Sequence, residues 1–117
     1  MKFTDTLKKN YEFQRLYHKG KSAVSPFLVL YVRKANRQFN RIGLTVSTKL
    51  GKAVQRNKIR RRLREIYRLH EDELIHGIDL VIVARGRAAG ASYKCLEDNF
   101  LAQAGKLGLI KKAEEKH

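Results

Sequence analysis

The feature that most constrains this sequence is a stretch of 52 residues, from Phe13 to Arg64, that contains no Asp or Glu. The stretch holds 15 Lys and Arg, a number equal to the net charge of +15 of the whole 117-residue chain. Cations without hydrophobic partners stay disordered, but this stretch also carries the apolar patterns of strands and of a helix. It must therefore fold with its cations outside, and we expect a folded basic face.

Length and composition favour one folded domain with a polyanionic partner. A chain of 117 residues with 43% hydrophobic residues supports a single core, so we expect one folded domain over residues 1–117. A pI near 10.3 indicates nucleic acid as the partner, or less often an anionic membrane surface. No apolar run approaches the roughly 20 residues that cross a bilayer, and none follows Met1. We therefore expect a cytoplasmic protein with no membrane partner.

Hydrophobic spacing predicts the order of the elements. It indicates a helix over 10–20, strands over 27–32 and 41–47, a helix over 52–70, a strand over 78–84 and a helix that begins after Ser92. The strands over 27–32 and 41–47 are predicted to be antiparallel, and Ala23 and Val24 suggest a further short strand. The run over 78–84 is apolar throughout, which is typical of a central or parallel strand buried on both faces.

These elements predict an α+β fold, a single-domain α/β sandwich. We expect a small, mostly antiparallel sheet of three to four strands with three helices, in the order α-β-(β)-β-α-β-α. With so few strands, the helices are expected to cover one face of the sheet. Part of the other face would stay open for a ligand.

The helix over 52–70 separates apolar from basic residues. At 100° per residue, Ile59, Leu63, Ile66 and Tyr67 form one core stripe. The opposite face carries Asn57, Arg60, Arg61, Arg64 and Arg68. An arginine face of this kind can bind several phosphates bidentately, and the amide can hydrogen-bond a base edge or a backbone oxygen. The helix is therefore the first candidate for contact with nucleic acid.

Four aromatic residues offer rings on which unpaired bases can stack. They are Phe13, Tyr17, Phe27 and Tyr31. Core packing is the alternative role for each ring. It competes evenly with stacking for the two Phe residues, and less strongly for the two Tyr residues because their polar tips suit a half-open face.

Residues that support catalysis are scarce. The basic stretch has no carboxylate to hold a metal and only one histidine, and neither Cys95 nor the four histidines share a ligand spacing. Cys95 is expected to be a packed thiol, and the acidic cluster over 71–73 is expected at a helix end. We predict no catalytic residue, no metal site and no cofactor held by the protein alone.

The segment over 41–65 carries a dense motif at fixed spacings, formed by Val46, Ser47, Lys49, Gly51, Ala53, Val54, Arg56, Asn57, Arg60, Arg61 and Arg64. These residues match the signature Val-Ser-x-Lys-x-Gly-x-Ala-Val-x-Arg-Asn-x-x-Lys/Arg-Arg-x-x-Arg, and in this the segment resembles the protein subunit of bacterial ribonuclease P. Further likeness covers 10–20, 28–31 and 79–85, and it weakens after Ala91. Thr48 and Lys58 depart from residues common in the family, which puts only individual contacts in doubt.

The resemblance implies a role beside a catalytic RNA. Such proteins assist an RNA that removes the 5′ leader of precursor tRNA, and Mg²⁺ is expected at that RNA. The leader would lie in a cleft between the first helix and the sheet, and the arginine-rich helix would face the RNA. By position, the leader residues would be Phe13, Tyr17, Tyr31, Thr45 and Asn57. The RNA subunit or phosphates would be bound by Lys49, Lys52, Arg56, Lys58, Arg60, Arg61, Arg64 and Arg68. The resemblance also implies an uncommon left-handed β-α-β crossover.

Three other functions compete with this interpretation. A DNA-binding helix-turn-helix regulator would need 44–64 to form two helices, but the alternation of Ile42, Leu44 and Val46 favours a strand. The composition would equally fit a structural RNA-binding protein of the ribosomal type. Only the signature over 41–65 argues against that function. A self-sufficient nuclease would have to cleave RNA without an RNA partner.

Overall fold

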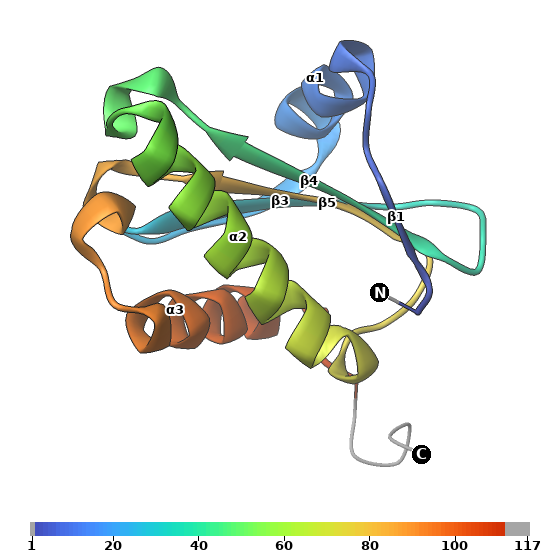
Figure 1. The fold of residues 1–117 in the computed structure, drawn as a ribbon. Helices are drawn as coiled ribbons and strands as arrows, with labels where there is room; N and C mark the ends of the chain where they lie inside the picture. The colour runs from blue at the N-terminus through green and yellow to red at the C-terminus, as the bar shows by residue number, and fades with distance from the viewer. Residues whose placement is uncertain (1, 112–117) are drawn as a thin grey trace.

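The computed structural model describes residues 2–111 as three helices and one five-stranded sheet (Figure 1). In chain order the elements are β1 (Thr4–Thr6), α1 (Asn10–Lys19), β2 (Lys21–Val24), β3 (Leu28–Lys34), β4 (Asn40–Val46), α2 (Ala53–His70), β5 (Ile78–Ala84) and α3 (Tyr93–Lys106). The α+β class and the three helices are confirmed, and the short strand suggested near Ala23 is present as β2.

The sheet has the order β1-β4-β5-β3-β2, which differs from the prediction in strand number and pairing. β1 pairs with β4 and β4 with β5 in parallel, whereas β3 pairs with β5 and β2 with β3 in antiparallel. The sheet is therefore mixed rather than mostly antiparallel. β3 and β4 do not pair, because β5 lies between them. An apolar strand such as β5 is best buried in the centre of the sheet, which explains the insertion.

β1 has no counterpart in the predicted elements because its three residues are polar and long-range contacts hold it. It pairs with β4, and Glu71 beyond the end of α2 accepts hydrogen bonds from the backbone N–H of Lys2 (2.8 Å) and Phe3 (3.3 Å). Thr4 Oγ1 donates to the same carboxylate at 2.5 Å. Burial alone would raise the pKa of Glu71, but these donors outweigh it and lower the pKa. Glu71 is thus structural, as expected.

Helices lie on both faces of the sheet (Figure 1). α2 and α3 cover one face, where the main core includes Leu30, Ile82, Leu63 and Phe100. α1 lies on the other face over a small cluster centred on Leu16. The prediction that all helices cover one face was therefore wrong, because α1 has an apolar side of its own to bury. Part of this second face stays uncovered, as expected.

The connection from β4 through α2 to β5 joins two parallel neighbours of the sheet. Ile59, Leu63, Ile66 and Tyr67 are all buried beneath α2, so the predicted core stripe is confirmed. This is the unit for which the family resemblance implies a left-handed crossover. Because the apolar stripe fixes the rotation of α2 about its axis, the basic side of the helix faces outward.

Gly20 sets the distance between α1 and the sheet. A Cβ at this position would lie 2.6 Å from the carbonyl oxygen of Leu16 and 2.9 Å from that of Val32. Any larger residue would therefore push the end of α1 away from β3. The glycine caps the helix in an extended conformation, with φ of −80°.

Candidate nucleic-acid interface

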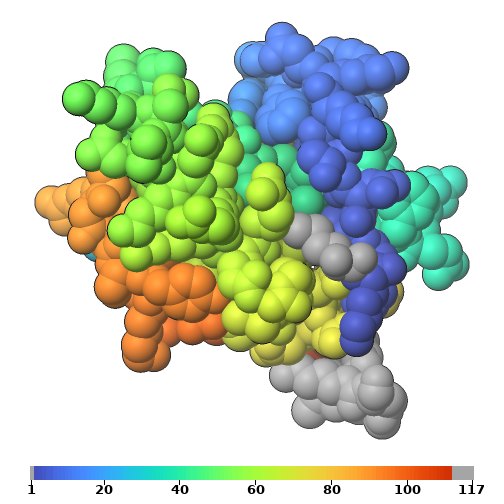
Figure 2. All heavy atoms as spheres, viewed as in Figure 1, coloured from blue at the N-terminus to red at the C-terminus, as the bar shows by residue number. Residues whose placement is uncertain are grey.

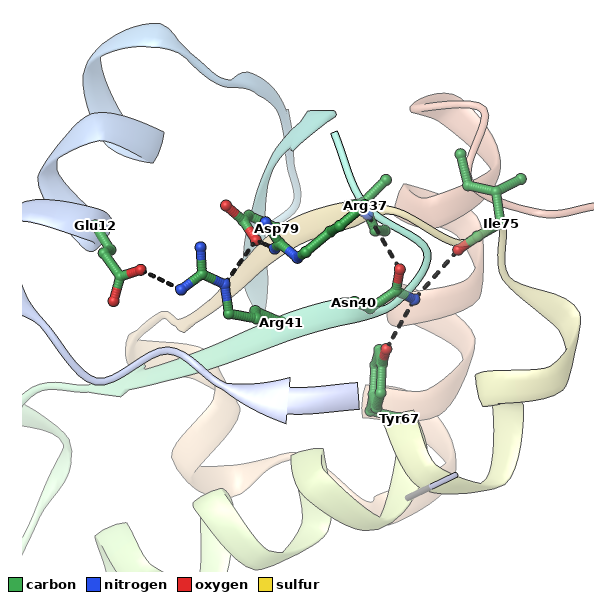
Figure 3. Close-up of polar contacts among 8 residues, drawn as sticks. Glu12, Arg37, Asn40, Arg41, Tyr67, Ile75 and Asp79 are labelled. Carbon is green, nitrogen blue, oxygen red and sulfur yellow. Dashed lines mark hydrogen bonds and ion pairs between the residues drawn. The ribbon is translucent and has the colours of Figure 1, made fainter. Parts of the chain in front are cut away.

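The buried side-chain amide of Asn40 joins β4, α2 and the start of β5 by hydrogen bonds (Figure 3). Asn40 in β4 donates from Nδ2 to the Tyr67 hydroxyl and to the Ile75 carbonyl, each at 3.2 Å, and accepts from the Ile78 N–H at 3.1 Å. Burial raises the pKa of Tyr67, so its hydroxyl stays neutral and can share these hydrogen bonds. The network holds α2 in place relative to β4 and β5.

Ion pairs fasten α1 to the opposite face (Figure 3). Arg41 Nη1 lies 2.5 Å from Glu12 Oε2 of α1, and Arg41 Nε lies 3.5 Å from Asp79 Oδ1 of β5. Arg37 also pairs with Asp79. Burial would raise the pKa of Glu12, but the Lys9 N–H and Arg41 outweigh it and lower the pKa. Two of the 15 cations therefore have structural roles, which the sequence did not reveal.

Three of the predicted leader residues meet beneath α1. The rings of Tyr17 and Tyr31 pack edge to face with centroids 5.1 Å apart, and the Tyr17 hydroxyl lies 2.9 Å from Thr45 Oγ1. Both tyrosines are half-buried against Leu16 and Val81. Each ring thus combines packing with partial exposure, so part of its surface is accessible to a ligand.

The ring of Phe13 lies directly over a glycine of β4. A Cβ on Gly43 would come within 2.5 Å of the Phe13 ring, so a larger residue would displace it. A glycine inside a strand pattern is a signal for such a close approach, and it identifies Gly43 as a residue the candidate set lacked. Phe13 is half-buried and keeps part of its surface in contact with solvent.

The candidate cations follow α2 and the turn before it. They are Lys49, Lys52, Arg56, Lys58, Arg60, Arg61, Arg64 and Arg68. Arg56 and Arg60 are half-buried and the other six are exposed. Within residues 2–111, Arg68 is the only one of the eight in an ion pair, at 2.5 Å from Glu65. The remaining seven charges have no acidic partner there, so they attract anions from outside.

Asn57 is separated from the aromatic rings and belongs to the α2 surface. Its Oδ1 accepts a hydrogen bond from Arg60 Nη1 at 3.1 Å, and Arg60 Nη2 donates to the Val46 carbonyl at 3.4 Å. Val46 directly follows Thr45, which contacts Tyr17. Arg60 therefore connects the predicted amide to the end of β4, beside the predicted rings.

A groove joins one aromatic residue, Phe13, to two arginines of α2. A cavity of about 220 Å³ lies between α1 and α2, and Figure 2 shows the hollow between the two helices with β4 beneath. Its lining consists of Thr6, Leu7, Phe13, Ile42, Leu44, Arg60 and Arg64. One wall thus presents an aromatic ring and the other presents two guanidinium groups, while aliphatic side chains form the floor.

The groove has the chemistry of binding rather than of catalysis. None of its lining residues is Asp, Glu, His or Cys, so they do not suit Mg²⁺. Across residues 2–111, no three such side chains gather where they could hold a metal ion. Cys95 is half-buried near the start of α3 rather than fully packed. Arg62, left out of the candidate set, donates to the Ala91 carbonyl at 3.1 Å and helps attach α2 to the segment before α3.

Comparison with known proteins agrees with this arrangement. The sequence model of the family described as ribonuclease P matches residues 1–108. The chain belongs to the ribonuclease P protein family. The ribonuclease P protein component of Alkaliphilus oremlandii is 40% identical over 97% of this chain and 99% of its own length. That of Clostridium botulinum is 44% identical over 85% of this chain and 93% of its own.

Solved structures of the family share the fold. The ribonuclease P protein of Staphylococcus aureus superposes with a TM-score of 0.82 at 31% identity, covering 91% of this chain and 97% of that chain. The protein from Thermotoga maritima gives 0.77 at 27% identity, covering 84% and 93%.

Family membership decides among the functions considered above. The chain is the RNA-binding protein subunit of an endoribonuclease, and catalysis comes from the RNA. The structure also removes the basis for a helix-turn-helix, because Asn40–Val46 forms a strand. No helix within residues 2–111 has the length and apolar character needed to span a bilayer.

Proposed function

We propose that the groove between α1 and α2 holds the single-stranded 5′ leader of precursor tRNA while the cations of α2 bind the catalytic RNA. In this arrangement the RNA, with its Mg²⁺, cuts the leader, and the protein supplies affinity and orientation. The protein holds no cofactor of its own. The cytoplasm is the expected compartment.

The observation that carries this proposal is the meeting of Phe13 with Arg60 and Arg64 in one groove. A single strand exposes both the flat faces of its bases and a chain of phosphates. An aromatic wall opposite two guanidinium groups matches both features at once. A duplex offers its bases only at their edges, so the ring favours an unpaired strand.

The surface of α2 suits a larger RNA. Seven cations that have no acidic partner among residues 2–111 span the helix and the turn before it, and their side chains are exposed or half-exposed. Arginine binds phosphate oxygens bidentately, so a row of arginines fixes the register of an RNA backbone. The position of Arg60 at the end of the groove supports a cleavage site close to both surfaces.

The test removes three arginines from the outer side of α2. We expect Arg60→Ala, Arg61→Ala and Arg64→Ala together to weaken assembly with the RNA subunit and to reduce leader removal at low Mg²⁺. Each phosphate that the variant no longer binds lowers the log-log salt slope by about 0.7 to 0.9. The fold should persist, because these residues lie opposite the buried stripe of α2. Binding is measured across a salt series and folding by a melting curve.

A matched control separates the α2 surface from net charge. Lys8→Ala, Arg15→Ala and Lys94→Ala also remove three positive charges, but from exposed positions outside α2. If both triple variants lose affinity equally, α2 is not the interface. Specific cutting of precursor tRNA by the protein cleared of all RNA would overturn the assignment of catalysis to the RNA.

A further inference from the structure

The 15 cations of the acid-free stretch divide into three groups in the folded protein. Eight lie on α2 or the turn before it, and two, Arg37 and Arg41, are held in ion pairs with Asp79 and Glu12. The remaining five are Arg15, Lys19, Lys21, Arg33 and Lys34. The expected single basic face is therefore incomplete as a description, because one third of the cations lie elsewhere.

Four of these five cations surround one cavity of about 500 Å³. Lys19 lies at the end of α1, Lys21 at the start of β2, and Arg33 and Lys34 at the end of β3. Apolar side chains that include Val32, Ile78 and Leu109 line the interior. The cavity thus combines a cationic rim with an apolar interior, and it is more than twice as large as the groove beside Phe13.

This cavity is separate from the groove in two respects. Lys34 pairs with Ile78 at the beginning of β5, whereas the strand that leads into α2 ends beside Ala84 at the other end of β5. The cavity also lies beside β2 and β3, whereas the groove lies beside β4, and β5 separates β3 from β4 in the sheet. The cavity and the groove are therefore at opposite edges of the sheet.

The four charges lack an acidic partner in the part of the chain that the structure describes. None of the residues around the cavity is Asp or Glu, and within residues 2–111 none of the four cations forms an ion pair. Asp79 lies opposite Arg33 in the register, but its carboxylate is engaged by Arg37 and Arg41. Clustered like charges repel one another, and this repulsion is relieved when a polyanion binds.

We propose that this cavity, rimmed by Lys19, Lys21, Arg33 and Lys34, is a second docking site for the RNA subunit. It rests on the proposed function, because it assumes that α2 binds the same RNA. Phosphates of the RNA contact the cations, and a ribose or base face covers the apolar interior. The RNA subunit is the occupant because a large folded RNA can reach both ends of a protein 41 Å long, whereas the proposed leader site lies at the opposite edge of the sheet, beside β4.

The test removes the three lysine charges of the rim and leaves the residues of the groove unchanged. Lys19→Gln, Lys21→Gln and Lys34→Gln together should weaken binding of the RNA subunit at least tenfold at moderate salt. The salt slope should fall by about 0.7 to 0.9 for each phosphate that is no longer bound. All three side chains are exposed, so the melting temperature should stay unchanged. The control is Lys8→Gln, Arg15→Gln and Lys94→Gln, which removes the same charge and should have a clearly smaller effect.

Three results would overturn this proposal. Equal reductions in affinity for the rim variant and its control would mean that only net charge matters. A reduction confined to precursor tRNA, with the RNA subunit bound normally, would make the occupant the leader. The third concerns residues 112–117, whose removal leaves the net charge unchanged. If a chain ending at Lys111 binds RNA as weakly as the rim variant and no longer responds to the rim substitutions, the chain's own tail is the occupant.

The result also distinguishes this site from the proposed function. If the arginine triple on α2 weakens RNA binding and the rim triple does not, only the second site fails. If the arginine triple has no effect, the proposed function itself fails, whatever the rim variant does.

Discussion

The two faces of the sheet are built for different purposes. On the α2 and α3 side, a continuous core of fully buried side chains includes Leu63, Ile82 and Phe100. On the α1 side, the buried hydrophobic cluster consists of Leu7, Leu16 and Val81, and the aromatic rings around them are half-exposed. One face therefore supplies most of the stability, while the other keeps hydrophobic surface available for a ligand.

β5 supplies apolar side chains to both faces through simple alternation. Leu80 and Ile82 point to the main core, while Val81 and Val83 point to the α1 side. Both sets are apolar, so the strand alone does not determine which face stays open. The number of helices determines which face stays open, because two helices cover one face and the single ten-residue helix α1 covers the other.

The largest expected effect tests this division of stability. Leu63→Ala should lower the free energy of unfolding towards the upper end of the range of about 2–5 kcal/mol, because its surroundings are packed on all sides. Leu16→Ala should cost less within the same range, because the half-exposed neighbours of Leu16 can move into the space. Denaturant unfolding of both variants measures the difference. Equal reductions would show that the α1 side is packed as firmly as the main core.

The same comparison explains what the sequence predicts about the fold and what it does not. The stripe of Ile59, Leu63, Ile66 and Tyr67 was predictable because helical periodicity is local. The insertion of β5 between β3 and β4 was not, because pairing across the sheet depends on distant segments. β1 was missed for the same reason, since Thr4 depends on Glu71, 67 residues away.

The second expected effect concerns ligand binding on the open face. Tyr17→Ala or Tyr31→Ala should weaken binding of precursor tRNA by roughly 1–3 kcal/mol while barely changing that of mature tRNA, which has no leader to stack. Tyr17→Phe is the matched control, because it keeps the ring and removes only the hydroxyl that contacts Thr45. Both affinities and a melting curve are measured for each variant. Equally weakened binding of both RNAs, with a lower melting temperature, would assign that ring to packing alone.

The candidate site was only partly visible in the sequence. The rings and Thr45 come together as the family resemblance implied, and the arginines of α2 emerge from periodicity. The charge count could not separate structural cations from cations available to RNA. Arg37 and Arg41 are identified as structural only when the fold brings Glu12 and Asp79 beside them. The cavity beside Lys21 and Lys34 was equally hidden, since it forms where β2, β3 and the end of α3 meet.

Each face also has its own electrostatic anchor, and the two anchors respond to pH in opposite directions. On the α1 side, Glu12 pairs with Arg41, and the pKa of Glu12 is lowered. On the other side, His70 at the end of α2 contacts Glu73 at 2.5 Å and Glu97 of α3 at 2.8 Å. Burial lowers the pKa of His70, but the two carboxylates outweigh it and raise the pKa above its ordinary value of 6.5.

The smallest expected effect follows from the signs of these shifts. A lowered carboxyl pKa stabilises the fold above the ordinary value of 4.5, and this contribution is lost as pH falls through the folded-state pKa. A raised histidine pKa stabilises the fold below 6.5 and is lost as pH rises through the folded-state pKa. The difference in unfolding free energy between the parent and His70→Gln should therefore shrink from pH 6 to pH 9, while that for Glu12→Gln should shrink from pH 6 to pH 3. Denaturant unfolding at the three pH values measures both. A His70→Gln difference that is the same at pH 6 and pH 9 would mean that His70 joins α2 to α3 as a neutral hydrogen-bonding group, without a charge.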